Sequence, residues 1–146
     1  MVPRLLCSLV VSAAACGDEP PPTCTTVELA CAPLYPPTFS NVYATTLAGK
    51  CGGDRVACHS DRGRAGGMSF GTEALAHAEL LAPGLGRVVP GDAACSEMIV
   101  RTQGVGADYQ MPPGEALTAE ERCALVQWVA AGAPGPVVTT RPGGAP

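Results

Sequence analysis

The most informative stretch of the chain is Cys51-Gly-Gly-Asp-Arg-Val-Ala-Cys58-His59. Between its two cysteines lies Gly52-Gly53-Asp54, which is typical of a turn because Gly tolerates positive φ and Asp bonds to its own backbone. A turn at this place returns Cys51 to the side of Cys58. The two thiols then either hold a common ligand or form a disulfide with each other, and the local sequence leaves both outcomes open.

Cys58 and His59 match the second half of Cys-x-x-Cys-His, the sequence that attaches a c-type haem. In such a site the thiols bond the porphyrin and the His ligates the iron. The spacing is wider here than in the usual motif, because six residues separate Cys51 from Cys58. Cys51 and Cys58 are therefore candidate thioether residues, and His59 is the candidate proximal ligand of the iron.

Met111-Pro112-Pro113-Gly114 supplies a candidate ligand for the other face of the iron. A residue before Pro is driven into extended geometry, so this loop is able to present the Met111 thioether to a cofactor. Met68 and His77 are weaker candidates, and a methionine that only fills a gap is the alternative. A His/Met pair raises the haem potential and fills both axial positions, which suits electron transfer rather than catalysis.

The composition excludes several classes of function. Only 15% of the 146 residues are charged, the formal net charge is −4, and no run of Lys or Arg occurs. Nucleic acid is therefore not an expected partner, because phosphate binding needs clustered cations. The chain has no apolar stretch of transmembrane length. It also lacks a Gly-rich phosphate loop and a Gly-x-Ser-x-Gly motif, so we predict that it is not an enzyme of those classes.

Residues 1–15 are predicted to be a bacterial lipoprotein signal peptide. Arg4 makes the start positive, an apolar run follows, and Ala13-Ala14-Ala15 precede Cys16. Cys16 is then the lipidated first residue, which tethers the protein to a membrane surface, facing the periplasm or the cell exterior, without spanning it. An ordinary secretory signal cut near the same place is the alternative, and both interpretations export the protein.

The cysteine count favours an exported protein, because disulfides persist in oxidising compartments. Apart from Cys7 and Cys16, the cysteines are Cys24, Cys31, Cys51, Cys58, Cys95 and Cys123. Closeness in sequence predicts a Cys24–Cys31 disulfide. The helices predicted below favour a Cys95–Cys123 disulfide that clamps two of them, which leaves the remaining two cysteines together.

We divide the chain into the signal peptide 1–15, a Pro-rich tether 16–37, a compact domain 38–132 and a disordered tail 133–146. Four helices are predicted in the domain, over about 39–48, over about 73–82, after Asp92 and after Thr118. Thr72 and Asp92 are the expected N-caps of the second and third, and Thr118 to Glu121 form a capping box. The predicted fold is a small all-α domain of about four helices with long loops. Its core is thin, so disulfides or a cofactor between the helices should add stability.

The order of these features resembles the small cytochrome c-like domains of exported planctomycete and myxobacterial proteins. The resemblance covers roughly residues 38–133 and implies one covalently bound haem c, with thioethers at Cys51 and Cys58, His59 as proximal ligand and Met111 as distal ligand. It does not require the Cys95/Cys123 pair. The motifs that carry it are Gly66-Gly67-Met68-Ser69-Phe70, Val89-Pro90-Gly91-Asp92, Met111-Pro112-Pro113-Gly114, Leu117-Thr118-Ala119-Glu120-Glu121 and Trp128-Val129-Ala130-Ala131-Gly132-Ala133.

The leading hypothesis is therefore an exported, lipid-anchored, monohaem c-type cytochrome-like protein that passes single electrons to a redox partner protein. The alternative is a haem-free, disulfide-stapled domain of the same fold that acts as a surface or interaction module. A copper or other metal carrier that uses His59, His77 and methionines is a third possibility, since thioether and imidazole suit copper.

Overall fold

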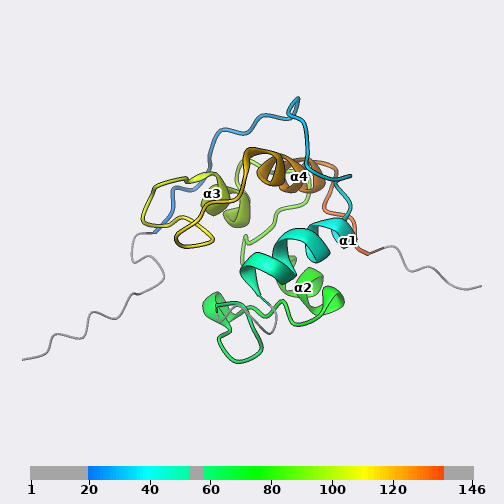
Figure 1. Ribbon diagram of the computed structural model, residues 1–146, viewed down its shortest axis with the longest axis vertical. Coiled ribbons are helices and arrows are strands. Elements are labelled where there is room, and N and C mark those ends of the chain that lie inside the picture. Colours follow the sequence, from blue (N-terminus) through cyan, green and yellow to red (C-terminus); the bar gives the residue numbers. More distant parts are fainter. Residues whose placement is uncertain (1–19, 53–57, 137–146) are drawn as a thin grey trace, which may run out of the picture.

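The computed structural model describes residues 20–52 and 58–136 of the chain. In this part the secondary structure is helical, apart from an isolated bridge between Val89 and Asp92, and long loops join short helices (Figure 1). The predicted all-α fold is thus confirmed. The predicted signal peptide and the lipidation site Cys16 lie outside the described residues. No helix within the described ranges is both long and apolar enough to cross a membrane.

The first helical segment ends at the first cysteine of the Cys-His stretch. Helix α1, Phe39–Asn41, continues directly into the π-helix η1, Val42–Cys51. Thr38 caps the start, as its hydroxyl accepts a hydrogen bond from Asn41 N–H at 3.4 Å. At the end, the Gly52 N–H donates to the Leu47 carbonyl at 2.8 Å. The helix predicted near residues 39–48 therefore exists, and its extension holds Cys51 on a regular element.

The predicted second helix is also present. A short 3-10 turn, η2, spans Ala65–Gly67, and helix α2 spans Glu73–Leu80. Thr72 caps α2 as predicted, because its hydroxyl accepts a hydrogen bond from Leu75 N–H at 3.3 Å. Helix α2 lies beside η1 in the lower half of Figure 1.

The predicted start of the third helix is wrong. Helix α3 spans Glu97–Gln103 and follows Ser96, not Asp92. The Asp92 carboxylate accepts a hydrogen bond from Cys95 N–H at 3.1 Å, which closes a turn ahead of the helix. The buried Ser96 hydroxyl stabilises the same turn, since it donates to the Asp92 carbonyl at 2.7 Å and accepts from Val89 N–H at 2.8 Å. Cys95 consequently lies in the turn and not on the helix.

The fourth helix matches its sequence signal in full. Helix α4 spans Ala119–Ala130, and Thr118 and Glu121 form the predicted capping box. The helix carries Trp128, which is fully buried and packs against the Phe39 ring at 5.1 Å between centroids. The core thus forms where α4 meets α1 and η1. Its buried apolar members are Phe39, Val42, Leu47, Phe70, Ala76, Leu80, Val88, Ala93, Ile99, Leu117, Leu125, Val126, Trp128, Val129 and Ala133.

Residues 20–37, which we call the N-terminal strap, run across α3 and α4 at the top of Figure 1. Backbone hydrogen bonds hold the strap to the domain, with Thr25 N–H donating to Ala94 at 2.8 Å and Leu34 N–H donating to Glu120 at 3.0 Å. The expected tether is therefore fastened along its described length. This path also decides how the cysteines pair.

The disulfides join Cys24 to Cys95 and Cys31 to Cys123. All four predicted disulfide cysteines are bonded, but the predicted Cys24–Cys31 and Cys95–Cys123 pairings are wrong. The predicted pairings assumed a strap folded on itself and a Cys95 carried on α3. The extended strap instead brings Cys24 to the turn ahead of α3 and Cys31 to the N-terminal half of α4.

The packed part of the chain continues into the residues expected to form the tail. Ala133 is buried, and its carbonyl bonds to His77 Nε2 at 3.0 Å. Trp128 Nε1 donates to the Pro134 carbonyl at 3.0 Å.

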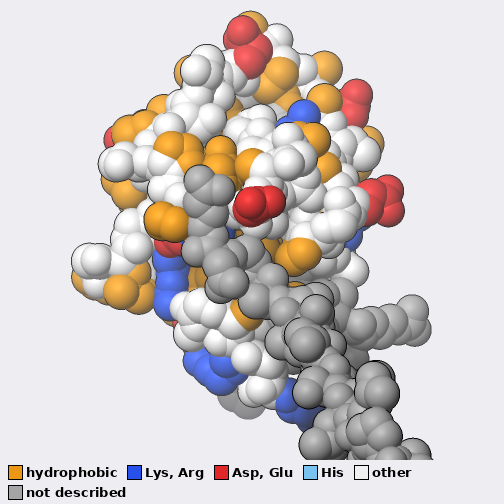
Figure 2. Space-filling model, turned by 90° about the vertical axis from the view of Figure 1, so that its left-hand side faces the viewer, with side chains coloured by type: hydrophobic (Ala, Val, Ile, Leu, Met, Phe, Trp, Pro, Cys, Tyr) orange, Lys and Arg blue, Asp and Glu red, His pale blue; other side chains and the backbone are white. Residues whose placement is uncertain are grey.

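The side of the molecule drawn in Figure 2 shows hydrophobic side chains scattered among polar ones, with most Lys and Arg side chains toward its lower end.

We expect peptide mapping under non-reducing conditions to recover the Cys24–Cys95 and Cys31–Cys123 links. Because these links close loops with sequence separations of 71 and 92 residues, removing either one should lower the free energy of unfolding by about 2–4 kcal/mol. The variants are C24S/C95S and C31S/C123S, measured by denaturant unfolding. Recovery of a Cys24–Cys31 peptide would contradict the described path of the strap.

Candidate functional site

A cavity of about 220 Å³, partly open to solvent, lies among η1, the end of α2, α3, the middle of α4 and the loops between them. Its lining is largely apolar, and it draws residues from distant parts of the chain. A ligand in it would therefore contact every helix except α1. The lining residues are Thr46, Leu47, Cys51, His59, Ala65, Gly66, Met68, Phe70, Leu80, Arg87, Glu97, Met98, Arg101, Thr102, Met111, Leu117 and Leu125.

The backbone brings Cys51 and His59 together on one wall of this cavity. The His59 N–H donates to the Cys51 carbonyl at 3.1 Å, and the Phe70 N–H donates to the His59 carbonyl at 2.7 Å. The two ends of the long spacer therefore meet, although residues 53–57 lie outside the described part. The turn predicted at Gly52-Gly53-Asp54 falls largely outside the described residues, and the observed contact is the one between Cys51 and His59.

Gly52 is essential to this closure because there is no room for a side chain. A Cβ atom at Gly52 would lie 2.5 Å from the His59 carbonyl oxygen and 2.7 Å from the Phe70 Cβ. The first neighbour is a backbone atom of His59, and the second belongs to Phe70, whose N–H bonds to the His59 carbonyl. A larger residue would thus push His59 away from Cys51.

Cys51 and Cys58 are both thiols in the structure. Burial raises the pKa of Cys51 to about 12, with smaller increases from the Glu121 carboxylate and from Cys58, while Lys50 opposes them. The Cys51 thiol is therefore protonated at neutral pH and lies at the cavity surface. Cys58 is not among the lining residues, and its carbonyl accepts a hydrogen bond from Ala65 N–H at 2.7 Å.

The His59 imidazole lies against Phe70, with 4.9 Å between the ring centroids. Burial lowers the pKa of His59, the Ala65 carbonyl acts in the opposite direction, and the charges of Arg87 and Arg101 lower it further. Its Nδ1 is buried and has no hydrogen-bond partner among the described residues. An unsatisfied buried nitrogen is costly, so its presence in a cavity wall indicates a site for a ligand.

Three methionines line the cavity, namely Met68, Met98 and Met111. Met111 is held by its backbone, since its N–H donates to the Arg101 carbonyl at 3.1 Å. The structure thus brings the sequence-predicted Met111 to the same cavity as His59. Met98 was not predicted as a site residue, because its spacing on α3 is equally that of a core residue.

His77 does not reach the cavity. Its ring packs edge-on against Phe39 at 4.7 Å, and its Nε2 bonds to the Ala133 carbonyl at 3.0 Å. The predicted copper site would need His59 and His77 together, so this geometry contradicts it. Within the described ranges no group of three or more His, Cys, Asp or Glu side chains could hold a metal ion.

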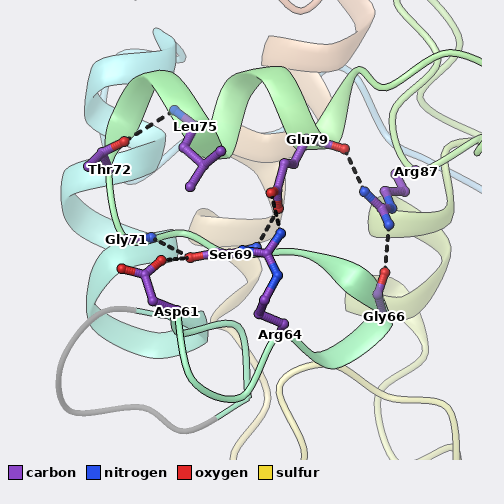
Figure 3. Close-up of polar contacts among 9 residues, drawn as sticks. All are labelled: Asp61, Arg64, Gly66, Ser69, Gly71, Thr72, Leu75, Glu79 and Arg87. Atoms are coloured by element: carbon purple, nitrogen blue, oxygen red, sulfur yellow. Dashed lines mark hydrogen bonds and ion pairs between the residues drawn. The ribbon is translucent and has the colours of Figure 1, made fainter.

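The loop after His59 is fastened to α2 by a polar network (Figure 3). The buried Ser69 hydroxyl donates to the Asp61 carboxylate and accepts from Gly71 N–H at 3.1 Å. The Glu79 carboxylate accepts from Ser69 N–H and pairs with Arg64 at 2.7 Å. Burial acts to raise the pKa of Glu79, but these hydrogen bonds and the Arg64 charge outweigh it and lower the pKa overall. The network therefore holds the wall that contains His59 and Met68.

Glu121 ties the end of η1 to the start of α4 near Cys51. Its carboxylate, 3% exposed, pairs with Lys50 Nζ at 2.8 Å and also accepts from the Thr118 N–H at 2.9 Å. The strap reaches the same wall, because the Tyr35 and Thr46 hydroxyls share a hydrogen bond of 2.5 Å. The cavity walls are thus braced from outside, by Glu121 of the capping box and by Lys50 and Tyr35, which no local motif marks.

Comparison with known proteins gives a match over part of the chain. Residues 56–115 match the family model described as Planctomycete cytochrome C. The match includes Cys58, His59 and Met111, and it ends before α4. It supports a planctomycete-type cytochrome c-like domain, in agreement with the resemblance seen in the sequence. No curated protein and no solved structure matches the chain.

We expect Gly52→Ala to lower the free energy of unfolding by about 1–3 kcal/mol, because the new methyl group overlaps the His59 carbonyl and Phe70. Gly49→Ala is the matched control within η1, since a Cβ there meets nothing within 4 Å. That change should be neutral or stabilising by about 0.5–1 kcal/mol. Equal denaturant midpoints for the two variants would contradict the close approach at Gly52.

Proposed function

From the premise of a planctomycete-type cytochrome c-like domain, we propose that this protein is an exported single-electron carrier that binds one haem c in its cavity. The observation that carries the proposal is the meeting of Cys51, His59 and Met111 in the lining of one apolar cavity. These residues come from the end of η1, the following loop and the loop before α4. Their types match the thioether, proximal and distal roles of a c-type site.

The residues of the cavity fit such a group. His59 has a buried ring nitrogen without a partner, and its neutral imidazole is the form that binds iron. Cys51 presents a protonated thiol to the cavity, while Cys58 precedes the His directly. Cys51 and Cys58 would hold the porphyrin through thioethers, and His59 and Met111 would ligate the iron.

The haem would supply a one-electron couple at its iron. The chain would set the reduction potential of that couple and would exclude water from the cavity. Apolar residues such as Leu47, Phe70 and Leu125 exclude solvent, which disfavours the more highly charged oxidised state. A Met111 ligand acts in the same direction compared with a second His. Electron transfer, not substrate turnover, is what such a filled site performs.

We further propose that the protein faces an oxidising compartment and is lipid-anchored to a membrane surface through Cys16. Two disulfides that fasten the strap support the first part, because such links persist outside the cytoplasm. The signal-like sequence before Cys16 supports the second part. The partner would be a redox protein that reaches the cavity from the same compartment.

The haem is tested by producing the protein in a host that matures c-type cytochromes, then recording intact mass and visible spectrum after denaturation. We expect one haem to remain attached, and C51S and C58S to each retain one thioether. The C51S/C58S double variant should lose its haem on denaturation. A colourless protein that contains only the Cys24–Cys95 and Cys31–Cys123 links would instead support the haem-free interaction module.

The distal ligand is tested by Met111→Ala in the haem-loaded protein. We expect this change to alter the visible spectrum and to lower the reduction potential, because the iron loses a thioether that favours its reduced state. Met68→Ala and Met98→Ala are matched controls, since both side chains line the same cavity. If Met68→Ala produced the spectral change and Met111→Ala did not, the assignment of Met111 would be wrong.

A further inference from the structure

The apolar lining of the cavity is interrupted by three charged residues, Arg87, Glu97 and Arg101. They belong to α3 and to the loop that leads into it, so they form one edge of the cavity, which we call the arginine edge. Two guanidinium groups stand against one carboxylate, and the edge therefore carries net positive charge. Burying such charge beside apolar surface is unfavourable unless a counter-charge is present.

Arg101 uses only part of its donor capacity inside the protein. Its Nε pairs with the Glu97 carboxylate at 2.8 Å, and its Nη1 makes a long contact of 3.5 Å with the Tyr109 carbonyl. A guanidinium has five N–H donors arranged in a fork that suits a carboxylate. The side chain is 23% exposed, so it lies between the cavity and solvent.

Arg87 is neutralised even less. Its Nη1 donates to the Glu79 carbonyl at 2.9 Å and its Nη2 to the Gly66 carbonyl at 2.6 Å, so both partners are uncharged (Figure 3). Among the described residues Arg87 forms no ion pair, and the Glu79 carboxylate pairs with Arg64 instead. The two carbonyls fix the direction of the guanidinium, and its charge is balanced only in part, because it shares the Glu79 carboxylate with Arg64 and makes no direct pair with it.

Both arginines line the cavity among apolar residues, so their positive charge favours an anion there. A neutral ligand that fills the space would leave the arginine edge uncompensated, whereas a carboxylate would pair with it.

We propose that Arg87 and Arg101 form a carboxylate-binding subsite, so the cavity selects a planar apolar ligand with anionic groups on one edge. This inference rests on the proposed haem function and adds to it the direction of the ligand: the two haem carboxylates lie toward the arginine edge. Glu97 weakens carboxylate binding at this subsite, because its own carboxylate already pairs with Arg101 Nε.

The test uses the full chain with C51S/C58S, so that ligands bind reversibly, titrated with haemin and with haemin dimethyl ester by absorbance. The ester has the same ring and iron but no ionised carboxylates. We expect haemin to bind about tenfold or more tightly than the ester, since charge-assisted hydrogen bonds are the strong ones. R87Q and R101Q should each reduce that ratio several-fold, and E97Q should increase it.

The ratio of the affinities for haemin and for its dimethyl ester distinguishes loss of the subsite from damage to the fold. A loosened cavity weakens both ligands equally, whereas loss of a carboxylate partner weakens haemin alone. R87K keeps the charge and should retain part of the preference. R62Q is the matched control, because Arg62 is exposed and does not line the cavity.

Two outcomes would overturn the subsite while leaving the haem function intact: equal affinity for haemin and its ester in the parent chain, or an equal loss of preference in R62Q and R87Q. Failure of the parent chain to bind either ligand, together with no covalent haem in the unsubstituted protein, would overturn both the haem function and the subsite. A preference that falls in R87Q and R101Q and rises in E97Q supports the inference.

Discussion

The hydrogen bond from His59 N–H to the Cys51 carbonyl is the contact on which the cavity depends. It joins the end of η1 to the loop that carries His59. The two ends of the long spacer are therefore held together whatever the length of chain between them. The absence of a side chain at Gly52 makes the approach possible. A Cys-His site does not need tight spacing in sequence when the chain closes the gap in space. The proposed haem site is thus compatible with this unusual spacer.

The strap and the polar braces compensate for a small core. Trp128 and Phe39 supply much of the buried aromatic surface, and few other large side chains are available. Disulfides from the strap to Cys95 and Cys123 therefore add stability by fastening the strap to the turn ahead of α3 and to α4. The same strap reaches the cavity wall through Tyr35. Stability of the domain and shape of the cavity are for this reason coupled.

The cavity combines an apolar interior with an unevenly charged edge. Apolar walls favour a hydrophobic ring and disfavour charge, while Arg87 and Arg101 favour an anion at one side only. A ligand that satisfies both demands has a flat apolar body and acidic groups at one edge. The network of Ser69, Asp61 and Glu79 adjoins Arg87 and keeps the wall that carries His59 in place. Selectivity would then come from the contrast between the two sides and not from any single residue.

Local signals in the sequence determined the elements that depend on neighbouring residues. Thr72 and the Thr118–Glu121 box mark two helix starts correctly, because capping is a contact within one turn. Cys58, His59 and Met111 were identified by their residue types and settings. The start of α3 was missed because the buried Ser96 hydroxyl bonds to the turn made by Asp92.

Only the tertiary structure decided which cysteines pair and which charges meet the cavity. Cys24 and Cys31 are close in sequence, yet the extended strap carries them to separate partners. Arg87 resembles any loop arginine until its guanidinium is seen bonded to two distant carbonyls. Capping and turns are set by bonds across a few residues, whereas pairing and burial depend on the path of the whole chain.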